Sequence, residues 1–384
     1  MVISKHMENK DLIEQIQSCT DCLECLEKCD TYQVTQDPLK SPNGRLKIAD
    51  KVFQNKSISA EELTALYTCT LCGLCDLACE NKIQIADIIH YTKIKLVDSN
   101  KAPLEINNKI IRGIIETDNS VKGNPDERLE WIPDNFRKKE KFEGEVSDTL
   151  LFLGCMSSFR VKESASASYE LLKIGGYNFK ILEKEPCCGE YVYSAGNLDL
   201  AKKIFNDNYT RFKRLGIKNI ITTCGGCLYA FNNVYPKYIE DWDIEVKHVI
   251  QLIYDCFHND TIKFSKSHKE ITYHDPCRLG RKLKFFDIYD EPRELLAQAS
   301  IKVNEISNSR HLTPCCGAGS GIRGVDSSIS IKIGSNILDQ APTEEIVTAC
   351  PLCVFNYRYV NYKTQMNKKI RYITEFLLEM TEKG

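Results

Sequence analysis

Residues 185–191 read EPCCGEY, and the pattern returns at residues 313–319 as TPCCGAG. Two neighbouring cysteines therefore precede a glycine twice in one chain. A disulfide needs Cα atoms that are farther apart and differently aimed than those of adjacent residues, so the thiols of each pair are not expected to bond to each other. Two thiolates on one turn can instead hold an inorganic cluster from one side.

The sequence around these pairs is repeated as well. The run TLLFLGC at 149–155 has a counterpart in EITYHDPC at 270–277, and NIITTCGGC at 219–227 has one in EIVTACPLC at 345–353. In both copies short apolar runs alternate with amphipathic helical stretches. This alternation predicts two α/β modules, each with a parallel sheet covered by helices.

Each copy contains five cysteines, spaced C-x31-CC-x35-C-x2-C in the first and C-x37-CC-x33-C-x2-C in the second. Ligands of parallel sheets bind beyond the carboxyl ends of the strands, where two cysteine positions of each copy fall, so the five thiols are expected to converge. Zinc and a cubane cluster take four ligands. Five thiols therefore indicate a larger or irregular iron–sulfur assembly, unless one cysteine per copy is spare. The two sets are Cys155, Cys187, Cys188, Cys224 and Cys227, and Cys277, Cys315, Cys316, Cys350 and Cys353.

A different cysteine pattern occupies the first 100 residues. The runs at 19–29 and 69–79 both follow C-x2-C-x2-C-x3-C, the spacing of two-cluster ferredoxins, in which the fourth cysteine of each run ligates the other cluster. Zinc is the alternative, but it is usually bound by separated C-x2-C pairs. The spacing predicts two cubane [4Fe–4S] clusters, one on Cys19, Cys22, Cys25 and Cys79 and the other on Cys69, Cys72, Cys75 and Cys29.

The residue after each run is acidic, Asp30 and Glu80, where such runs usually continue with proline. We interpret these acids as lowering the potential of a nearby cluster. Apolar residues recur at helical spacing around the runs, and Ser59 followed by Glu62 predicts a helix-capping box. This part of the chain is therefore predicted to be an all-helical ferredoxin domain.

The predicted architecture is α + α/β. An all-helical two-cluster ferredoxin domain (1–100) is followed by a polar linker or covering arm (101–146), a first module (147–265) and a second module (266–384). The role of the linker segment does not follow from its sequence. Cys256 falls outside both five-cysteine sets and is expected to be a buried, apolar-like cysteine.

Composition narrows the class of protein. The chain has 384 residues, 42% of them hydrophobic, and a net charge of −2, which gives no electrostatic reason to expect nucleic acid or an anionic membrane as a partner. No apolar run approaches the ~20 residues of a membrane span, so we expect a cytoplasmic protein, with peripheral docking on a membrane partner left open. The 19 cysteines indicate metal or redox chemistry in a reducing compartment.

With these motifs in place, the chain resembles a known family. Two CCG cysteine-rich domains behind a two-cluster ferredoxin domain are similar to the fused catalytic subunit of heterodisulfide reductase, which reduces the mixed disulfide of coenzyme M and coenzyme B in methane metabolism. Iron–sulfur subunits of glycolate oxidase, lactate-utilisation and anaerobic glycerol-3-phosphate dehydrogenase systems share this layout. Further matching phrases are SPNGRLKIA at 41–49, YHDPCRLGR at 273–281 and DEPREL at 290–295; departures are Gly225, often proline, and Ser320, often glycine.

The resemblance implies one non-cubane [4Fe–4S] cluster on each five-cysteine set. Our first hypothesis is that electrons pass from a soluble flavoprotein or membrane cytochrome b partner through the cubanes to these two clusters. There they would cleave a disulfide, either that of coenzymes M and B or a similar one, with each sulfur captured on iron. His274 is expected to supply a proton or hold substrate, and Arg278 and Arg281 to pair with a sulfonate or phosphate, the alternative being structural hydrogen bonds.

Two other functions stay open. The chain could relay electrons for an FAD-dependent glycolate, lactate or glycerol-3-phosphate dehydrogenase, which would require only a conducting path. It could also be a scaffold that uses its clusters structurally or delivers them to another protein. Both five-cysteine sets are intact, and this favours the disulfide-reducing function.

Overall fold

The computed structural model describes residues 9–137, 146–283 and 286–382. The outer ends of the first and last predicted domains, and residues 138–145 of the linker segment, lie outside the described residues. The chain forms two compact units. The first contains residues up to Arg112 together with Gly189–Lys203 and Pro314–Ile337, and the second contains Gly113–Cys188, Ile204–Thr313 and the chain from Leu338 onward. The domain borders expected from the sequence stay a prediction.

The first unit is helical. Its N-terminal part packs α4 against α7 over a core that includes Leu46, Leu66 and Ile88. Ser59 and Glu62 form the predicted capping box at the start of α5, so that prediction is confirmed. The N-terminal elements are α1 (Asn9–Gln17), α2 (Glu24–Glu27), α3 (Asp30–Thr35), η1 (Pro38–Lys40), α4 (Pro42–Phe53), α5 (Ala60–Tyr67), α6 (Leu74–Ala78), α7 (Ile85–Asp98) and the start of α8 (Glu105–Thr117).

Two later segments of the chain complete this unit, each directly after or around a cysteine pair. Ser320 lies in the second segment and has a left-handed backbone (φ 53°), the conformation that explains why glycine is common at this position. Its hydroxyl accepts a hydrogen bond from the buried Lys93 amine at 3.0 Å. The elements are α12 (Glu190–Ser194) and the start of α13 (Leu198–Arg214), then η6 (Gly319–Gly321), α18 (Ile322–Val325) and most of α19 (Ser327–Gln340).

The second unit contains two parallel sheets, which confirms the predicted fold class. The first has strand order β1-β2-β3 and the second β5-β4-β6-β7, and every pair is parallel. In the second sheet β5 is the edge strand beside β4. In the first sheet the corresponding edge, beside β1, has only a single β-bridge between Leu150 and Lys180. The strands are β1 (Thr149–Phe152), β2 (Asn219–Thr222), β3 (Glu245–His248), β4 (Glu270–His274), β5 (Lys302–Val303), β6 (Glu345–Thr348) and β7 (Lys369–Tyr372).

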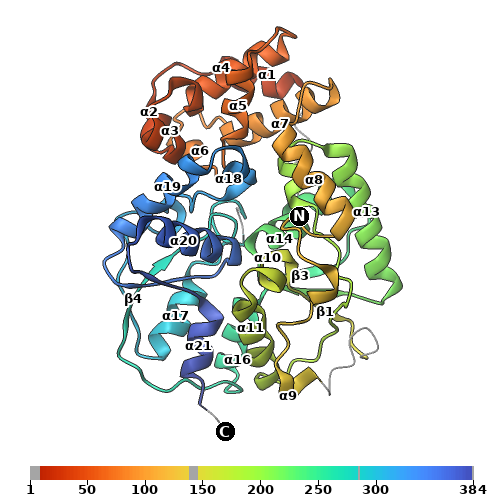
Figure 1. The fold of residues 1–384 in the computed structure, drawn as a ribbon, viewed down its shortest axis with the longest axis vertical. Coiled ribbons are helices and arrows are strands. Elements are labelled where there is room, and N and C mark those ends of the chain that lie inside the picture. The colour runs from red at the N-terminus through yellow and green to blue at the C-terminus, as the bar shows by residue number, and fades with distance from the viewer. Residues whose placement is uncertain (1–8, 138–145, 284–285, 383–384) are drawn as a thin grey trace. The chain divides into compact units, whose positions relative to one another are not determined.

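The two modules pack on each other inside this unit through helices that lie between the sheets (Figure 1), where α11 contacts α21 and α16 contacts α17. Ser168 of α11 and Thr374 of α21 are hydrogen-bonded at 3.0 Å. The Tyr372 hydroxyl donates to the Thr223 carbonyl at 2.7 Å. The principal helices are α10 (Gly154–Phe159), α11 (Lys162–Ile174), α14 (Gly225–Tyr229), α16 (Val249–His258), α17 (Asp290–Gln298), α20 (Pro351–Thr364) and α21 (Ile373–Met380).

Shorter elements connect these helices and strands. They are η2 (Pro125–Glu127), α9 (Asp134–Arg137), the π-helical turn η4 (Ala230–Val234), α15 (Tyr235–Tyr238) and η5 (Arg310–Leu312). Across the described residues, no helix combines the length and apolar character that crossing a membrane would need.

Candidate metal centres

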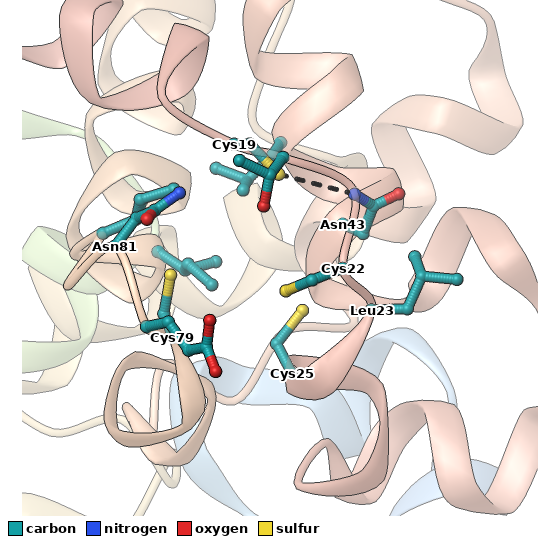
Figure 2. A pocket seen from close by; sticks show the side chains of 12 residues that line it. Cys19, Cys22, Leu23, Cys25, Asn43, Cys79 and Asn81 are labelled. Atoms are coloured by element: carbon teal, nitrogen blue, oxygen red, sulfur yellow. Dashed lines mark hydrogen bonds between the residues drawn. The ribbon is translucent and has the colours of Figure 1, made fainter.

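Four cysteines from both N-terminal runs line one pocket of about 380 Å³, and Figure 2 shows their side chains around it. Leu23 has a left-handed backbone (φ 67°) directly before α2, and this turn brings the cysteines on either side of it to the same pocket. Asn43 lies on the rim, with its amide nitrogen 3.6 Å from the Cys19 sulfur. The four cysteines are Cys19, Cys22, Cys25 and Cys79.

A second pocket, of about 360 Å³, has the complementary set Cys29, Cys69, Cys72 and Cys75. The buried Arg45 reaches it, with Nη1 3.8 Å from the Cys29 sulfur. Arg45 is fixed by hydrogen bonds to the Ala65 carbonyl and the Thr68 hydroxyl. Each pocket thus combines three cysteines of one run with the fourth cysteine of the other, as the crossed arrangement expects; ligation itself stays a prediction.

The electrostatics of these pockets suit a group that carries positive iron. Burial, reinforced by Cys19 and Cys22, raises the pKa of Cys25 to about 12. Burial also raises the pKa of Cys29 to about 11, although Arg45 opposes the shift. Thiolates crowded at low dielectric need a compensating cation. Among the residues that the structure describes, no group of three or more His, Cys, Asp or Glu side chains is close enough together to hold a single metal ion.

The first five-cysteine set lies entirely in the second compact unit. Cys155 is in the first turn of α10, Cys224 directly precedes α14, and Cys227 lies within α14. The Cys227 and Cys188 sulfurs are 3.4 Å apart. A Cβ on Gly154, where φ is +72°, would lie 3.0 Å from the Cys227 sulfur, so this turn requires glycine.

Two residues of the linker segment reach this set, and sequence reasoning missed both. The Ser120 hydroxyl lies 3.2 Å from the Cys155 sulfur. Arg128 forms a buried ion pair with Glu185, at 3.1 Å. Glu185 also accepts hydrogen bonds from the backbone N–H groups of Leu153 and Gly154, at 2.9 and 2.8 Å. Burial raises the pKa of Glu185, while Arg128 and these N–H groups oppose the shift.

The second five-cysteine set is divided between the compact units. Cys277, Cys350 and Cys353 belong to the second unit, and Cys315 and Cys316 to the first. Cys350 immediately precedes α20, as Cys224 precedes α14, so the repeat places these two cysteines at equivalent helix starts.

The module containing Cys277 has its own buried carboxylate, Asp275. Arg293 donates two hydrogen bonds to it, both at 2.8 Å. The Arg310 N–H donates to it at 2.8 Å and the Thr313 hydroxyl at 3.2 Å. Asp275 therefore connects the loop that begins before Cys277 to the loop that leads toward the second cysteine pair.

The two sets approach each other within the second unit at Cys224 and Cys350, whose thiols are within hydrogen-bonding reach. Donation from Cys224 and from Cys353 lowers the pKa of Cys350. The Cys227 thiol favours ionisation of Cys224, but the bond toward Cys350 and burial outweigh it and raise the pKa of Cys224. Because neighbouring thiols cannot all ionise in this environment, the junction again suits a cationic group.

Gly225 explains one departure from the related sequences. A Cβ at this position would lie 3.2 Å from Leu279 and 3.3 Å from Arg278. The Arg278 guanidinium lies over the Tyr229 ring, 4.4 Å from its centroid. Residues that follow Cys277 therefore pack against the helix that carries Cys227, and the glycine allows the close approach.

The remaining candidates have mostly structural contacts. His274 ends β4, is buried, and packs edge-on against the Tyr357 ring at 5.1 Å. Arg281 donates to the backbone carbonyls of His311 and Thr313, as its structural alternative anticipated. Cys256 is buried in α16, with its sulfur 3.8 Å from the Gly175 carbonyl.

Comparison with known proteins agrees with this layout. The 4Fe–4S dicluster domain matches residues 15–83, and the cysteine-rich domain matches twice, at 149–232 and 271–358. One relative is a component of the dihydromethanophenazine:CoB–CoM heterodisulfide reductase of Methanosarcina mazei. The chain is 28% identical to it over 92% of this chain and 90% of that protein.

Two further relatives show the breadth of the similarity. A component of the fumarate reductase (CoM/CoB) of Methanothermobacter marburgensis is 25% identical over 88% of this chain and 67% of that protein. EtfAB:quinone oxidoreductase of Syntrophomonas wolfei is 33% identical over 55% of this chain and 31% of that protein.

The dicluster domain followed by two cysteine-rich domains defines an iron–sulfur oxidoreductase protein. The predicted resemblance is confirmed, and the chain is an iron–sulfur oxidoreductase subunit of the heterodisulfide reductase type.

Proposed function

We propose that this protein reductively cleaves a small-molecule disulfide. The reaction consumes one disulfide, two electrons and two protons and yields two thiols. Iron–sulfur clusters supply the electrons one at a time when bound. The observation that best supports the proposal is the approach of Cys224 to Cys350, because two neighbouring one-electron centres suit a two-electron substrate.

The proposed cluster ligands are the cysteines of the two N-terminal pockets and of the two five-cysteine sets. The pockets would hold cubane [4Fe–4S] clusters, and the five-cysteine sets would hold non-cubane [4Fe–4S] clusters. Arg45 and Asn43 would donate to ligand sulfurs in the pockets, and Ser120 would do so at Cys155. Hydrogen bonds to sulfur help set cluster potentials, so these side chains would tune the path.

His274 remains the proposed proton source, three residues before Cys277. Its burial at the end of β4 would keep bulk water from competing for the proton. The disulfide of coenzymes M and B is the proposed substrate, because a relative that carries these names covers 92% of the chain. An electron-donating partner, a soluble flavoprotein or a membrane cytochrome b, would reduce the cluster held in the first pocket.

The test begins with iron and sulfide counts on anaerobically purified protein. We expect about 16 irons per chain, four for each of four clusters, and an EPR signal that appears only when coenzyme M or coenzyme B thiol is added to the oxidised protein. Cys224→Ser should remove the thiol-dependent signal. Cys256→Ala is the matched control. Cys256 is buried like the proposed ligands, but it contacts Gly175 and belongs to neither five-cysteine set, so this variant should leave both readouts unchanged. About 8 irons without any thiol response would contradict the proposal.

Electron relay is the second candidate, favoured by the similarity to EtfAB:quinone oxidoreductase over 55% of the chain. It requires electron transfer through the clusters and no binding of thiol to them. About 16 irons, rapid reduction by a flavoprotein and no thiol-dependent signal would support this function instead.

A further inference from the structure

Asp30 stands where related cysteine runs usually continue with proline, and it does more than add charge. It begins α3 directly after Cys29 and lines the pocket of Cys29, Cys69, Cys72 and Cys75. Its Oδ2 atom accepts a hydrogen bond of 2.8 Å from the backbone N–H of Cys315. Both residues belong to the first compact unit. The carboxylate thus connects a ferredoxin-type pocket to the second cysteine pair.

A second contact, between Thr70 and Gly319, joins the same pocket to the loop after the second cysteine pair. Thr70 lies between two cysteines of this pocket and lines it. A Cβ added to Gly319 would lie only 2.5 Å from the Thr70 carbonyl oxygen, so the glycine permits direct backbone approach. The loop after Cys316 therefore rests against the wall of the pocket at a point independent of Asp30.

The loop is also fixed from its far side. Lys93 is fully buried in α7 and donates to the Ser320 hydroxyl at 3.0 Å. Its amine lies 4.8 Å from the centre of the Tyr67 ring. These contacts tie the CCGAGS segment to the helices that form the pocket, so the juxtaposition does not depend on one flexible side chain.

The other cysteine run provides a contrast. Glu80 is the residue that matches Asp30, and it lines the first pocket but is exposed. Cys22 of that pocket is exposed as well, whereas Cys69 of the second pocket is buried. Both pockets open toward solvent to a similar degree, and the second also adjoins a cysteine pair.

We propose that Asp30 is a positioning residue that holds the second cysteine pair against the Cys29 pocket, so that electrons leave this pocket toward that pair. The donor partner would supply each electron to the pocket of Cys19, Cys22, Cys25 and Cys79. A cluster held in the Cys29 pocket would then lose one electron as the centre on the second cysteine pair gains one. What those electrons then do rests on the proposed function. A proline at position 30 would have no side-chain acceptor for the Cys315 N–H.

The first test measures hydrogen exchange of the backbone around Cys315 in the anaerobically purified full chain. Asp30→Ala should make the Cys315 amide exchange about 10- to 100-fold faster, the range expected for losing a hydrogen bond to a charged acceptor. Asp30→Asn keeps an acceptor oxygen and should restore most of the protection. Glu80→Ala is the matched control and should leave exchange unchanged. Unchanged exchange in Asp30→Ala would overturn the docking role.

The second test follows electrons by freeze-quench EPR after mixing with dithionite. In Asp30→Ala the cubane signals should form at the wild-type rate, and the reduction of the five-cysteine centres should be delayed. Asp30→Asn should shorten the delay. Wild-type timing in Asp30→Ala would overturn the route. A protein in which Asp30→Ala speeds exchange but no thiol-dependent signal exists would sink the proposed function and leave the docking role supported.

Discussion

Each of the two cysteine-rich modules uses a buried carboxylate to connect two of its cysteine-bearing loops, but the carboxylate comes from opposite loops in the two modules. In the first, the carboxylate is Glu185, two residues before Cys187, and it binds backbone N–H groups just before Cys155. In the second, it is Asp275, two residues before Cys277, and it binds Thr313, two residues before Cys315. The carboxylate has exchanged loops, and each module still ties its two loops together.

The arginine partners differ in origin. Arg293 comes from α17, inside the second module. Arg128 comes from the linker segment, ahead of the first module. A buried carboxylate needs a compensating charge wherever it lies, so the first module depends on the linker in a way that the second does not. The linker segment thereby acquires a physical role.

The largest effect is expected from Arg128→Ala. Only 4% of the Arg128 side chain and 3% of Glu185 are exposed, so the substitution leaves a buried carboxylate without its ion-pair partner. Breaking such a pair costs about 3–5 kcal/mol. Anaerobic urea unfolding, followed by circular dichroism, measures the loss.

Arg293→Ala is the matched variant in the second module. The Arg293 side chain is 12% exposed, whereas that of Asp275 is 2% exposed. Removing Arg293 would therefore open a path for water to Asp275, and a smaller loss of about 1.5–3 kcal/mol is expected, the value of hydrogen bonds to a charged group. Equal losses in the two variants would contradict the greater dependence of the first module on its arginine.

Gly225→Pro should have an intermediate effect. Proline occupies the corresponding place in the second module, Pro351 at the start of α20, where its fixed φ suits a first helical residue. At position 225 the added atoms would meet Leu279, which lies 3.2 Å from a Cβ. We expect a loss of about 1–3 kcal/mol from overpacking, measured by the same unfolding experiment. Pro351→Gly is the converse control and should cost less; a stabilised Gly225→Pro would refute the packing explanation.

Tyr372→Phe probes the junction between the modules. It removes the hydroxyl that donates to the buried Thr223 carbonyl at 2.7 Å and leaves that acceptor without this donor. A loss of about 1–1.5 kcal/mol is expected. Tyr362→Phe, on an exposed side chain, should leave stability unchanged. If both variants unfold at the wild-type urea concentration, this hydrogen bond does not stabilise the junction.

Ser120→Ala should have the smallest effect and the most selective one. The hydroxyl lies 3.2 Å from the Cys155 sulfur, and a donor to sulfur raises a cluster potential. Loss of a bond worth about 0.5–1.5 kcal/mol corresponds to a fall of roughly 20–60 mV for a one-electron couple. An EPR-monitored redox titration should show one shifted five-cysteine signal and an unshifted one. A shift in both would indicate a general disturbance instead of a local hydrogen bond.

Much of the layout could be read from the sequence because cysteine spacing and strand ends are local features. The crossed grouping of Cys29 and Cys79 follows from run spacing, and the capping box at Ser59 follows from three residues. The missed residues are long-range partners. Ser120 lies 35 positions from Cys155, Arg128 lies 57 positions from Glu185, and Asp30 lies 285 positions from Cys315, and no periodicity links such pairs.

Gly225 and Ser320 show how a departure from related sequences becomes intelligible only in three dimensions. The sequence alone marks both as small residues in unusual places. The structure gives Gly225 a close approach to Leu279 and gives Ser320 a left-handed backbone with a hydrogen bond from Lys93. Neither reason is present in the neighbouring residues.

The sequence by itself determined the class of chemistry, the repeat and the parallel sheets, since thiol spacing and alternating apolar runs constrain these directly. Only the tertiary structure decided which charges compensate the buried carboxylates and which pocket adjoins Cys315. It alone also showed that the segments at the two cysteine pairs belong to the helical unit. Those choices depend on desolvation and close packing between distant segments, and such energies exist only once the chain is folded.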